Sequence, residues 1–344
     1  MKKTFVLTIL CLTTLFGSAN GFRGNGDNYK FEQKKDIEKS FEMDANSILE
    51  MEGIYSDFII TEWDQPQIDF SVKVVVKSND EKKAIARLNS INIVFERLGN
   101  KITAKTVFEN YPYRNFNGYT SIKYYVKVPK DVFMDLETKY GDITVNNVRK
   151  KFEADIKYGN LNADSLLADN DIDISYGNIS ATYAKNIYLD LKYGNAKMNK
   201  IAHIEGEIKY SNFIATEINR GVLNNRYSDV KIEKIDKLNT KNQYSDMRIT
   251  NVAHTLEAKI QYSDLKATCD GLYPNINIEG QYSDVNLKIS ENASFTYNLK
   301  TTYGDIKCKG ILDFTGSEAR GNYGKGESGS IAVQLLYGDL RINK

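Results

Sequence analysis

The sequence predicts an all-β fold, a parallel β-helix or β-solenoid, on three observations. First, a tripeptide of Tyr, then Gly or Ser, then Asp or Asn recurs at spacings of 17 to 21 residues. Second, apolar and polar residues alternate around each copy, which is the period of a strand with one buried face. Third, the 344 residues include 23 Tyr and only 4 Pro, a composition that favours strands. Repeats this short cannot bury their own apolar face, so they must stack as coils.

The first element is a signal peptide over residues 1–19. Lys2 and Lys3 precede an apolar run over residues 5–16, and Ala19 supplies a small residue for cleavage. The run is too short to cross a bilayer, which takes about 20 residues, and no later segment is comparable. We therefore expect an exported protein without a transmembrane segment, in the periplasm or at the cell surface.

Residues 20–135 form a strand-rich N-terminal part of the solenoid. An isolated copy of the repeat begins at Tyr55, and residues 68–76 alternate as one longer strand. Residues 80–89 predict a short helix, because acidic residues fill its first turn and apolar residues share one face. Residues 109–118 are rich in Asn and Tyr, and they predict an exposed loop that is a secondary binding candidate.

Regular solenoid repeats of about 17–21 residues occupy residues 136–344. The positions three and five residues after each Tyr are apolar in every copy, which separates a structural repeat from a chance tripeptide. The usual crossover chirality predicts a right-handed coil. The repeated tyrosines predict a structural ladder: Tyr140, Tyr158, Tyr176, Tyr193, Tyr210, Tyr227, Tyr244, Tyr262, Tyr282 and Tyr303. A further copy at Tyr337 follows 34 residues after the last of these, which is two repeats.

The tyrosine ladder has two interpretations. If exposed, it would be a strip of aromatic faces suited to stacking on sugars; if buried, it would be a packing spine whose hydroxyls reach the edge of the core. Each Tyr lies two residues beyond an inward position, so strand parity favours an inward side chain and the packing spine. The following position is Gly in some copies and Ser in others, which indicates a limit on side-chain size there.

The third position of the tripeptide predicts a ladder of stacked turns. It is acidic in the later copies, at Asp229, Asp246, Asp264, Asp284 and Asp305. Like charges at coil spacing repel unless they are solvated, bonded to amides or bridged by cations. Calcium is therefore one hypothesis for this row, but the calcium-binding Gly-Gly-x-Gly-x-Asp repeat is absent from the sequence, so solvated turn caps are the preferred interpretation.

Composition and counting argue against other chemistry, and no cofactor is predicted. The formal net charge is +1, from 46 basic and 45 acidic residues, which does not favour nucleic acid. His203 and His254 lie three coils apart, roughly 14 Å at ladder spacing, and cannot share a metal ion. Cys269 and Cys308 lie roughly 10 Å apart by the same spacing, which predicts two free thiols.

An enzyme is the alternative that the aligned carboxylates raise. Parallel β-helices can host polysaccharide cleavage by paired acidic residues. Here turn chemistry already accounts for Asp264 and Asp284, and the sequence gathers no Arg, Lys or His cluster around them. The sequence therefore favours a protein that is not an enzyme.

Several short motifs, in this order, are similar to those of a known family. They are Glu62-Trp63-Asp64 after a strand, a short helix leading into Ile91 and Ile93, Tyr125-Val126-Lys127-Val128-Pro129 before the repeats, and strand starts such as Gly141-Asp142-Ile143 and Gly338-Asp339-Leu340. Over residues 41–344 the chain resembles the adhesin β-solenoid domains of exported bacterial proteins, also called toastrack domains. The resemblance implies an exported, mostly β protein with an adhesin label, and it supplies no catalytic residues.

The sequence thus predicts a non-enzymatic adhesin or cell-envelope binding scaffold, whose partner is a glycan or an envelope or surface protein. The alternative is a periplasmic structural or sensory module that contacts another protein. The chain finishes directly after an apolar strand at Leu340 and Ile342, so the last coil is expected to leave an open edge that permits self-association.

Overall fold

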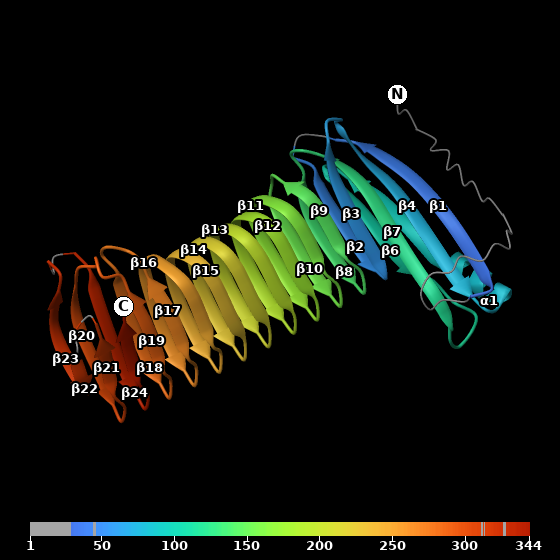
Figure 1. Ribbon diagram of the computed structural model, residues 1–344. Coiled ribbons are helices and arrows are strands. Elements are labelled where there is room, and N and C mark those ends of the chain that lie inside the picture. The colour runs from blue at the N-terminus through green and yellow to red at the C-terminus, as the bar shows by residue number, and fades with distance from the viewer. Residues whose placement is uncertain (1–28, 44–45, 311, 313, 326–327) are drawn as a thin grey trace.

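The protein was analysed as a computed structural model, which describes residues 29–43, 46–310, 312, 314–325 and 328–344 (Figure 1). The predicted signal peptide lies outside the described residues. The strands belong to one 25-stranded sheet that winds along the axis of an elongated molecule. No helix among the described residues is long and apolar enough to cross a membrane.

The N-terminal part holds one helix and nine strands. Their bounds are β1 (Phe31–Glu42), β2 (Ile48–Ile54), β3 (Ser56–Trp63), β4 (Gln67–Ser78), α1 (Glu81–Asn89), β5 (Ile91–Leu98), β6 (Lys101–Phe108), β7 (Gly118–Pro129), β8 (Phe133–Lys139) and β9 (Ile143–Val148). The regular coils follow as β10 (Phe152–Lys157), β11 (Leu161–Ser175), β12 (Asn178–Lys192), β13 (Asn195–Lys209), β14 (Asn212–Arg226), β15 (Asp229–Gln243) and β16 (Met247–Gln261).

The C-terminal part is built from shorter strands. They are β17 (Leu265–Cys269), β18 (Asn275–Gln281), β19 (Val285–Ile289), β20 (Phe295–Thr302), β21 (Ile306–Lys309), β22 (Phe314–Gly316), β23 (Glu318–Tyr323), β24 (Ser330–Leu336) and β25 (Leu340–Asn343).

Each of the strands β11 to β16 has 15 residues and forms most of one coil, and these strands pair in parallel with their neighbours. Equivalent residues stand above one another, as Ile179 does with Ala196 and Ala196 with Phe213. Alternate residues are buried between the two walls of the flattened coil, where they form one continuous core. The predicted parallel β-solenoid is confirmed.

The spacing of Tyr55 suggested a copy of the repeat that stands alone. In the structure this first coil belongs to the solenoid. Strands β2 and β3 stack directly on β8 and β9, with Met51 beside Leu136 and Phe58 beside Ile143. The chain between β3 and β8 is an insertion in which β4 pairs antiparallel with β7, and the other edge of β4 pairs antiparallel with β1, which precedes β2. The predicted helix is confirmed as α1, whose N-cap Asp80 accepts a hydrogen bond from the Lys83 amide.

The last coils are stacked in a different order from the chain. Strand β25 lies between β19 and β21 and pairs in parallel with both, so Leu340 is buried between Val285 and Ile306. The expectation that the Leu340–Ile342 strand leaves an open edge is therefore wrong. After β21 the chain reverses direction, and β22 and β23 pair antiparallel with β21 and β20. The chain then continues as β24, which lies between β18 and β20, and as β25, which lies between β19 and β21.

The two described cysteines are free and buried. Burial raises the pKa of the Cys269 thiol to about 12 and that of Cys308 to about 11, which suppresses thiolate chemistry at neutral pH. Because β19 and β25 both separate β17 from β21, the two thiols are one coil further apart than counting predicted.

Candidate functional site

The tyrosines of the repeat project outward, so the predicted packing spine is wrong. All twelve, including Tyr55 and Tyr337, have positive φ values between 50° and 61°. This left-handed residue breaks strand alternation, because it and the residue before it both face solvent while the next residue faces the core. The parity argument failed because it assumed that the strand stays extended through the corner.

The side chains form one unbroken stack, which we call the tyrosine ridge. In order along the axis its members are Tyr55, Tyr140, Tyr158, Tyr176, Tyr193, Tyr210, Tyr227, Tyr244, Tyr262, Tyr282, Tyr337 and Tyr303. Neighbouring ring centroids are 4.7 to 5.2 Å apart and the rings are within 14° of parallel.

The stack decides what the ridge can offer a ligand. Each inner ring is covered on both faces by its neighbours, so the ridge presents ring edges and hydroxyls instead of the aromatic faces that sugar stacking needs. Only Tyr303, at the end of the stack, is markedly more exposed, at 73% against 41–50% for the rest. Within the described part of the chain, the hydroxyls of the ridge have no hydrogen-bond partner, so they are free to bond a ligand.

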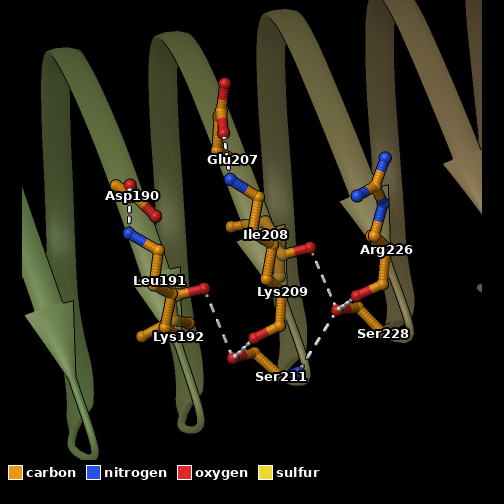
Figure 2. Close-up of polar contacts among 9 residues, drawn as sticks. All are labelled: Asp190, Leu191, Lys192, Glu207, Ile208, Lys209, Ser211, Arg226 and Ser228. Carbon is orange, nitrogen blue, oxygen red and sulfur yellow. Dashed lines mark hydrogen bonds and ion pairs between the residues drawn. The ribbon is translucent and has the colours of Figure 1, made fainter.

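The corner residue after each Tyr fixes the spacing of the ridge. In the coils of Tyr210 to Tyr282 it is a buried Ser whose hydroxyl donates to a carbonyl two residues back, and in Ser228 it also accepts the amide of the preceding coil's corner residue (Figure 2). Ser211 N–H, for example, donates to Ser228 Oγ at 3.2 Å, and Ser228 Oγ donates to Arg226 O at 2.8 Å. These bonds clamp adjacent coils directly beneath the tyrosines.

The position two residues after Tyr, which is acidic in the later coils, also forms a continuous row. The aspartate row is Asp229, Asp246, Asp264, Asp284, Asp339 and Asp305, in axial order. Its carboxylates accept backbone amides from the next coil, as Asp246 does from the Asp264 amide at 2.9 Å and Asp264 from the Asp284 amide at 3.2 Å. The described residues contain no cluster of three or more acidic, His or Cys side chains arranged to hold a metal ion. Amide bonding thus accounts for the row that suggested calcium.

A groove of about 490 Å³ runs along the aspartate row. Its other wall carries Lys231, Arg248 and Lys266, which have no ion-pair partner among the described residues, and the apolar Ile214 and Val230 line it as well. The groove therefore offers a row of carboxylates beside a row of cations over several coils. The expectation that no Arg or Lys cluster gathers around Asp264 and Asp284 is wrong, because it overlooked the basic position two residues further along these coils. Such a surface suits an extended, hydrogen-bonding ligand of low net charge.

A second groove, of about 770 Å³, lies on the other side of the ridge. It is more polar, and Arg226, Lys241, Asn242, Lys259 and Gln261 are among the residues that line it. The ridge thus separates two grooves along the C-terminal coils.

Sequence reasoning missed an acidic face on the N-terminal coils, before the tyrosine corner. Two adjacent rows of carboxylates stack in register: Glu50, Asp135, Glu153 and Asp171 in one, and Glu52, Glu137, Asp155, Asp173, Asp190 and Glu207 in the other. Aligning the positions three and five residues before each Tyr would have found it.

The acidic face perturbs its own members. Burial, followed by repulsion from Glu153 and Glu50, raises the pKa of Asp135. Burial and neighbouring aspartates likewise raise the pKa of Asp173. At its end, the Lys209 ammonium lowers the pKa of Glu207 through a hydrogen bond at 2.5 Å (Figure 2).

The two histidines lie on different coils and do not contact each other. His203 lies on β13, 3.5 Å from Glu205, while His254 lies on β16 against Asp236. Neither is joined by a hydroxyl or thiol nucleophile in the described hydrogen bonds.

The chain was compared with known proteins. The family model described as Toastrack DUF4097 matches residues 67–342. Solved structures similar to this chain include a putative adhesin from Parabacteroides distasonis, 15% identical, covering 90% of this chain and 97% of that one with a TM-score of 0.35. A putative adhesin from Parabacteroides merdae is 14% identical over the same shares, with a TM-score of 0.34. A putative lipid binding protein from Parabacteroides distasonis is 11% identical over the same shares, at 0.32. No curated protein sequence matched the chain.

Proposed function

Because the chain belongs to the Toastrack DUF4097 family, we propose that it is an exported, non-enzymatic binding scaffold of the bacterial cell envelope, acting in adhesion through its tyrosine ridge. The observation that carries the proposal is the row of twelve outward tyrosines beside the groove of the aspartate row. Fold alone does not determine function, whereas this surface presents specific hydrogen-bonding groups to a ligand.

The surface repeats one set of groups at each coil. A ligand that also repeats, at a similar rise, makes the same contact many times, and the energies of weak contacts then accumulate along the chain. Phenol hydroxyls, carboxylates and ammonium groups all bond sugar hydroxyls, whereas the covered ring faces offer no stacking platform. An extended neutral polysaccharide on the cell or host surface fits these groups best.

The test is pull-down of the purified protein with insoluble neutral polysaccharides such as cellulose, chitin, xylan and mannan. The triple variant Tyr227→Phe, Tyr244→Phe, Tyr262→Phe keeps the stacked rings and removes three hydroxyls. We expect at least tenfold weaker binding, with an unchanged melting temperature. Absence of binding by the wild type to every polysaccharide would reject the glycan proposal.

A matched control removes three exposed hydroxyls away from the ridge, in Tyr119→Phe, Tyr125→Phe, Tyr188→Phe. This control is expected to bind like the wild type. Equal losses in both triple variants would show that the ridge is not the binding surface.

Location is tested separately by protease treatment of intact and lysed cells. Cleavage on intact cells is expected for an adhesin. Protection until lysis would place the protein in the periplasm, reject adhesion, and favour the alternative of a structural or sensory module that contacts an envelope protein.

A further inference from the structure

A cationic site that the tyrosine ridge does not include lies at its N-terminal end. Arg87 stands in the last turn of α1 and packs among the aromatic residues of β6 and the following loop. Its guanidinium carbon lies 4.5 Å from the ring centroid of Phe108, 5.5 Å from that of Phe116 and 5.9 Å from that of Tyr111. The loop predicted over residues 109–118 thus packs Tyr111 and Phe116 around one arginine.

Arg87 has no acidic partner among the described residues. Its Nε donates to Thr120 Oγ1 at 3.4 Å, which is a long hydrogen bond, and its Nη atoms have no partner in that part of the chain. Arg149 shows the contrasting arrangement, because it forms a two-pronged ion pair with Glu62 at 3.0 and 3.3 Å. A partly buried cation without a counter-charge is costly, so its presence calls for an explanation.

A second polar group in the cluster is also unsatisfied. The Tyr111 hydroxyl is buried and has no hydrogen-bond partner within the described chain. Burial raises the pKa of this phenol, while the nearby Arg87 charge opposes the shift, so it remains a neutral donor. The Tyr111 hydroxyl and the Arg87 guanidinium beside it are thus both donors without a strong protein acceptor among the described residues, and together they can bond to an anion.

The surroundings define the ligand. The forked, planar donors of a guanidinium match the oxygens of a carboxylate, sulfate or phosphate, and aromatic rings on several sides exclude competing water. Lys83, 5.7 Å above the ring of Tyr113, adds a second positive charge nearby. Phe108 also touches the first ring of the ridge, Tyr55, edge to face at 6.1 Å.

We propose that Arg87 and the aromatic residues around it form an oxyanion-binding site that takes a carboxylate, sulfate or phosphate group. The site is separate from the ridge and does not depend on glycan binding there. Its position next to Tyr55 places the bound anion at the end of the stack, where it would fix the terminus of an acid-tipped ligand.

The experiment titrates the full-length mature protein with sodium sulfate, sodium phosphate and sodium glucuronate, each against sodium chloride of equal ionic strength. Binding is followed by NMR shifts of the residue 109–117 amides and by calorimetry. Saturable shifts with the inorganic salts alone would identify a free-ion site, and tighter binding of glucuronate would identify an acidic sugar. Identical responses to all salts and to chloride would reject the proposal.

The variant Arg87→Met keeps an apolar stem against the rings and removes the charge, and Arg87→Lys keeps the charge without the fork. We expect binding to fall at least tenfold in the first and several-fold in the second. Arg149→Met, which removes a paired surface arginine, is the control and should bind like the wild type. If Arg87→Met does not fold, the lysine variant decides: unaltered binding by a folded Arg87→Lys would reject the forked geometry.

The ridge variant Tyr227→Phe, Tyr244→Phe, Tyr262→Phe separates the two proposals. It should bind oxyanions normally whatever its effect on polysaccharide binding. Loss of oxyanion binding in this variant would place the anion on the ridge and overturn the assignment to Arg87.

Discussion

Two tracts of the solenoid form the same corner in different ways. From Tyr140 to Tyr193 the residue after Tyr is Gly, and from Tyr210 to Tyr282 it is Ser. A Cβ added to Gly177 would lie 1.7 Å from the carbonyl oxygen of Gly159, so there the backbones of adjacent coils are in direct contact. In the serine tract the same position holds a Cβ, and the hydroxyl bridges the coils by hydrogen bonds.

The difference teaches that Gly and Ser are not freely exchanged at this position, although both are small. Each tract has its own coil-to-coil geometry, one set by backbone contact and the other by hydroxyl bonds. Like corners therefore occur in blocks, and unlike corners meet only at the junctions of Ser56 with Gly141, Gly194 with Ser211 and Ser283 with Gly338. The sequence pattern shows such blocks.

The largest effect should come from adding a Cβ to the glycine tract. Gly177→Ala forces the Gly159 carbonyl aside at a corner stacked between neighbouring coils, and we expect a loss of about 3 kcal/mol of stability, at the upper end for overpacked sites. Urea unfolding, with hydrogen exchange of coils β11 to β13, measures it.

Gly206→Ala is the matched control for that change. Its new Cβ would meet only the Cδ2 atom of Leu223, at 2.9 Å, and a side-chain end can move. A loss in Gly177→Ala no larger than in this control would show that the glycine corners are not in backbone contact.

The next largest effect should come from removing one hydroxyl in the serine tract. Ser245→Ala leaves the buried Ser228 amide without its acceptor, which is 3.0 Å away, so we expect a loss of about 2 kcal/mol. Hydrogen exchange at Ser228 should accelerate most. Ser180→Ala, at an exposed position in the glycine tract, is the control. An equal loss of stability in this control would show that the hydroxyl bridge between coils does not stabilise the serine tract.

A smaller effect is expected at the Tyr corner, where a glycine variant should be more stable than an alanine variant, the reverse of the order usual within a strand. At Tyr210, φ is +52°, a conformation that costs a residue with a Cβ about 1 kcal/mol and glycine almost nothing. Both Tyr210→Ala and Tyr210→Gly lose the stacking on Tyr193 and Tyr227, but the glycine variant should be more stable by about 1 kcal/mol. Thermal unfolding of the two variants tests this, and alanine being more stable would contradict a left-handed corner.

Sequence reasoning reached the solenoid, the helix and the alignment of the ladders, because stacking forces equivalent residues of each repeat into one row. It gave the wrong direction for the Tyr side chains, because the positive φ of each Tyr interrupts the in-and-out alternation of the strand. A tyrosine in the sequence does not by itself indicate a positive φ. It recognised Tyr337 as a copy of the repeat but not its place between Tyr282 and Tyr303, because the antiparallel strands β22 and β23 change the order of the coils. Arg87 was missed because its cluster joins a helix, a strand and a loop, which no periodicity relates.

The smallest expected effect is on the pH dependence of stability, which should differ between Asp173 within the acidic face and Glu207 at its end. Burial and neighbouring aspartates raise the pKa of Asp173, so the folded state holds its proton more tightly than the unfolded state does. Its contribution to stability is therefore present in acid and is lost as the pH rises through the raised pKa. Glu207 behaves oppositely: the Lys209 hydrogen bond lowers its pKa, and its contribution is lost as the pH falls through that lowered value.

Asp173→Asn should thus stabilise the protein at pH 7, by less than about 1 kcal/mol because the charge is solvent-screened. The same variant should lose stability relative to the wild type as the pH is lowered towards the ordinary carboxyl range, since only the wild type gains by protonation there. Asp164→Asn, an exposed change on the same strand but after the tyrosine corner, is the control. Urea unfolding at several pH values measures both variants. If Asp173→Asn destabilised the protein at pH 7, the carboxylates of the acidic face would have to be held together by favourable contacts instead of repelling one another.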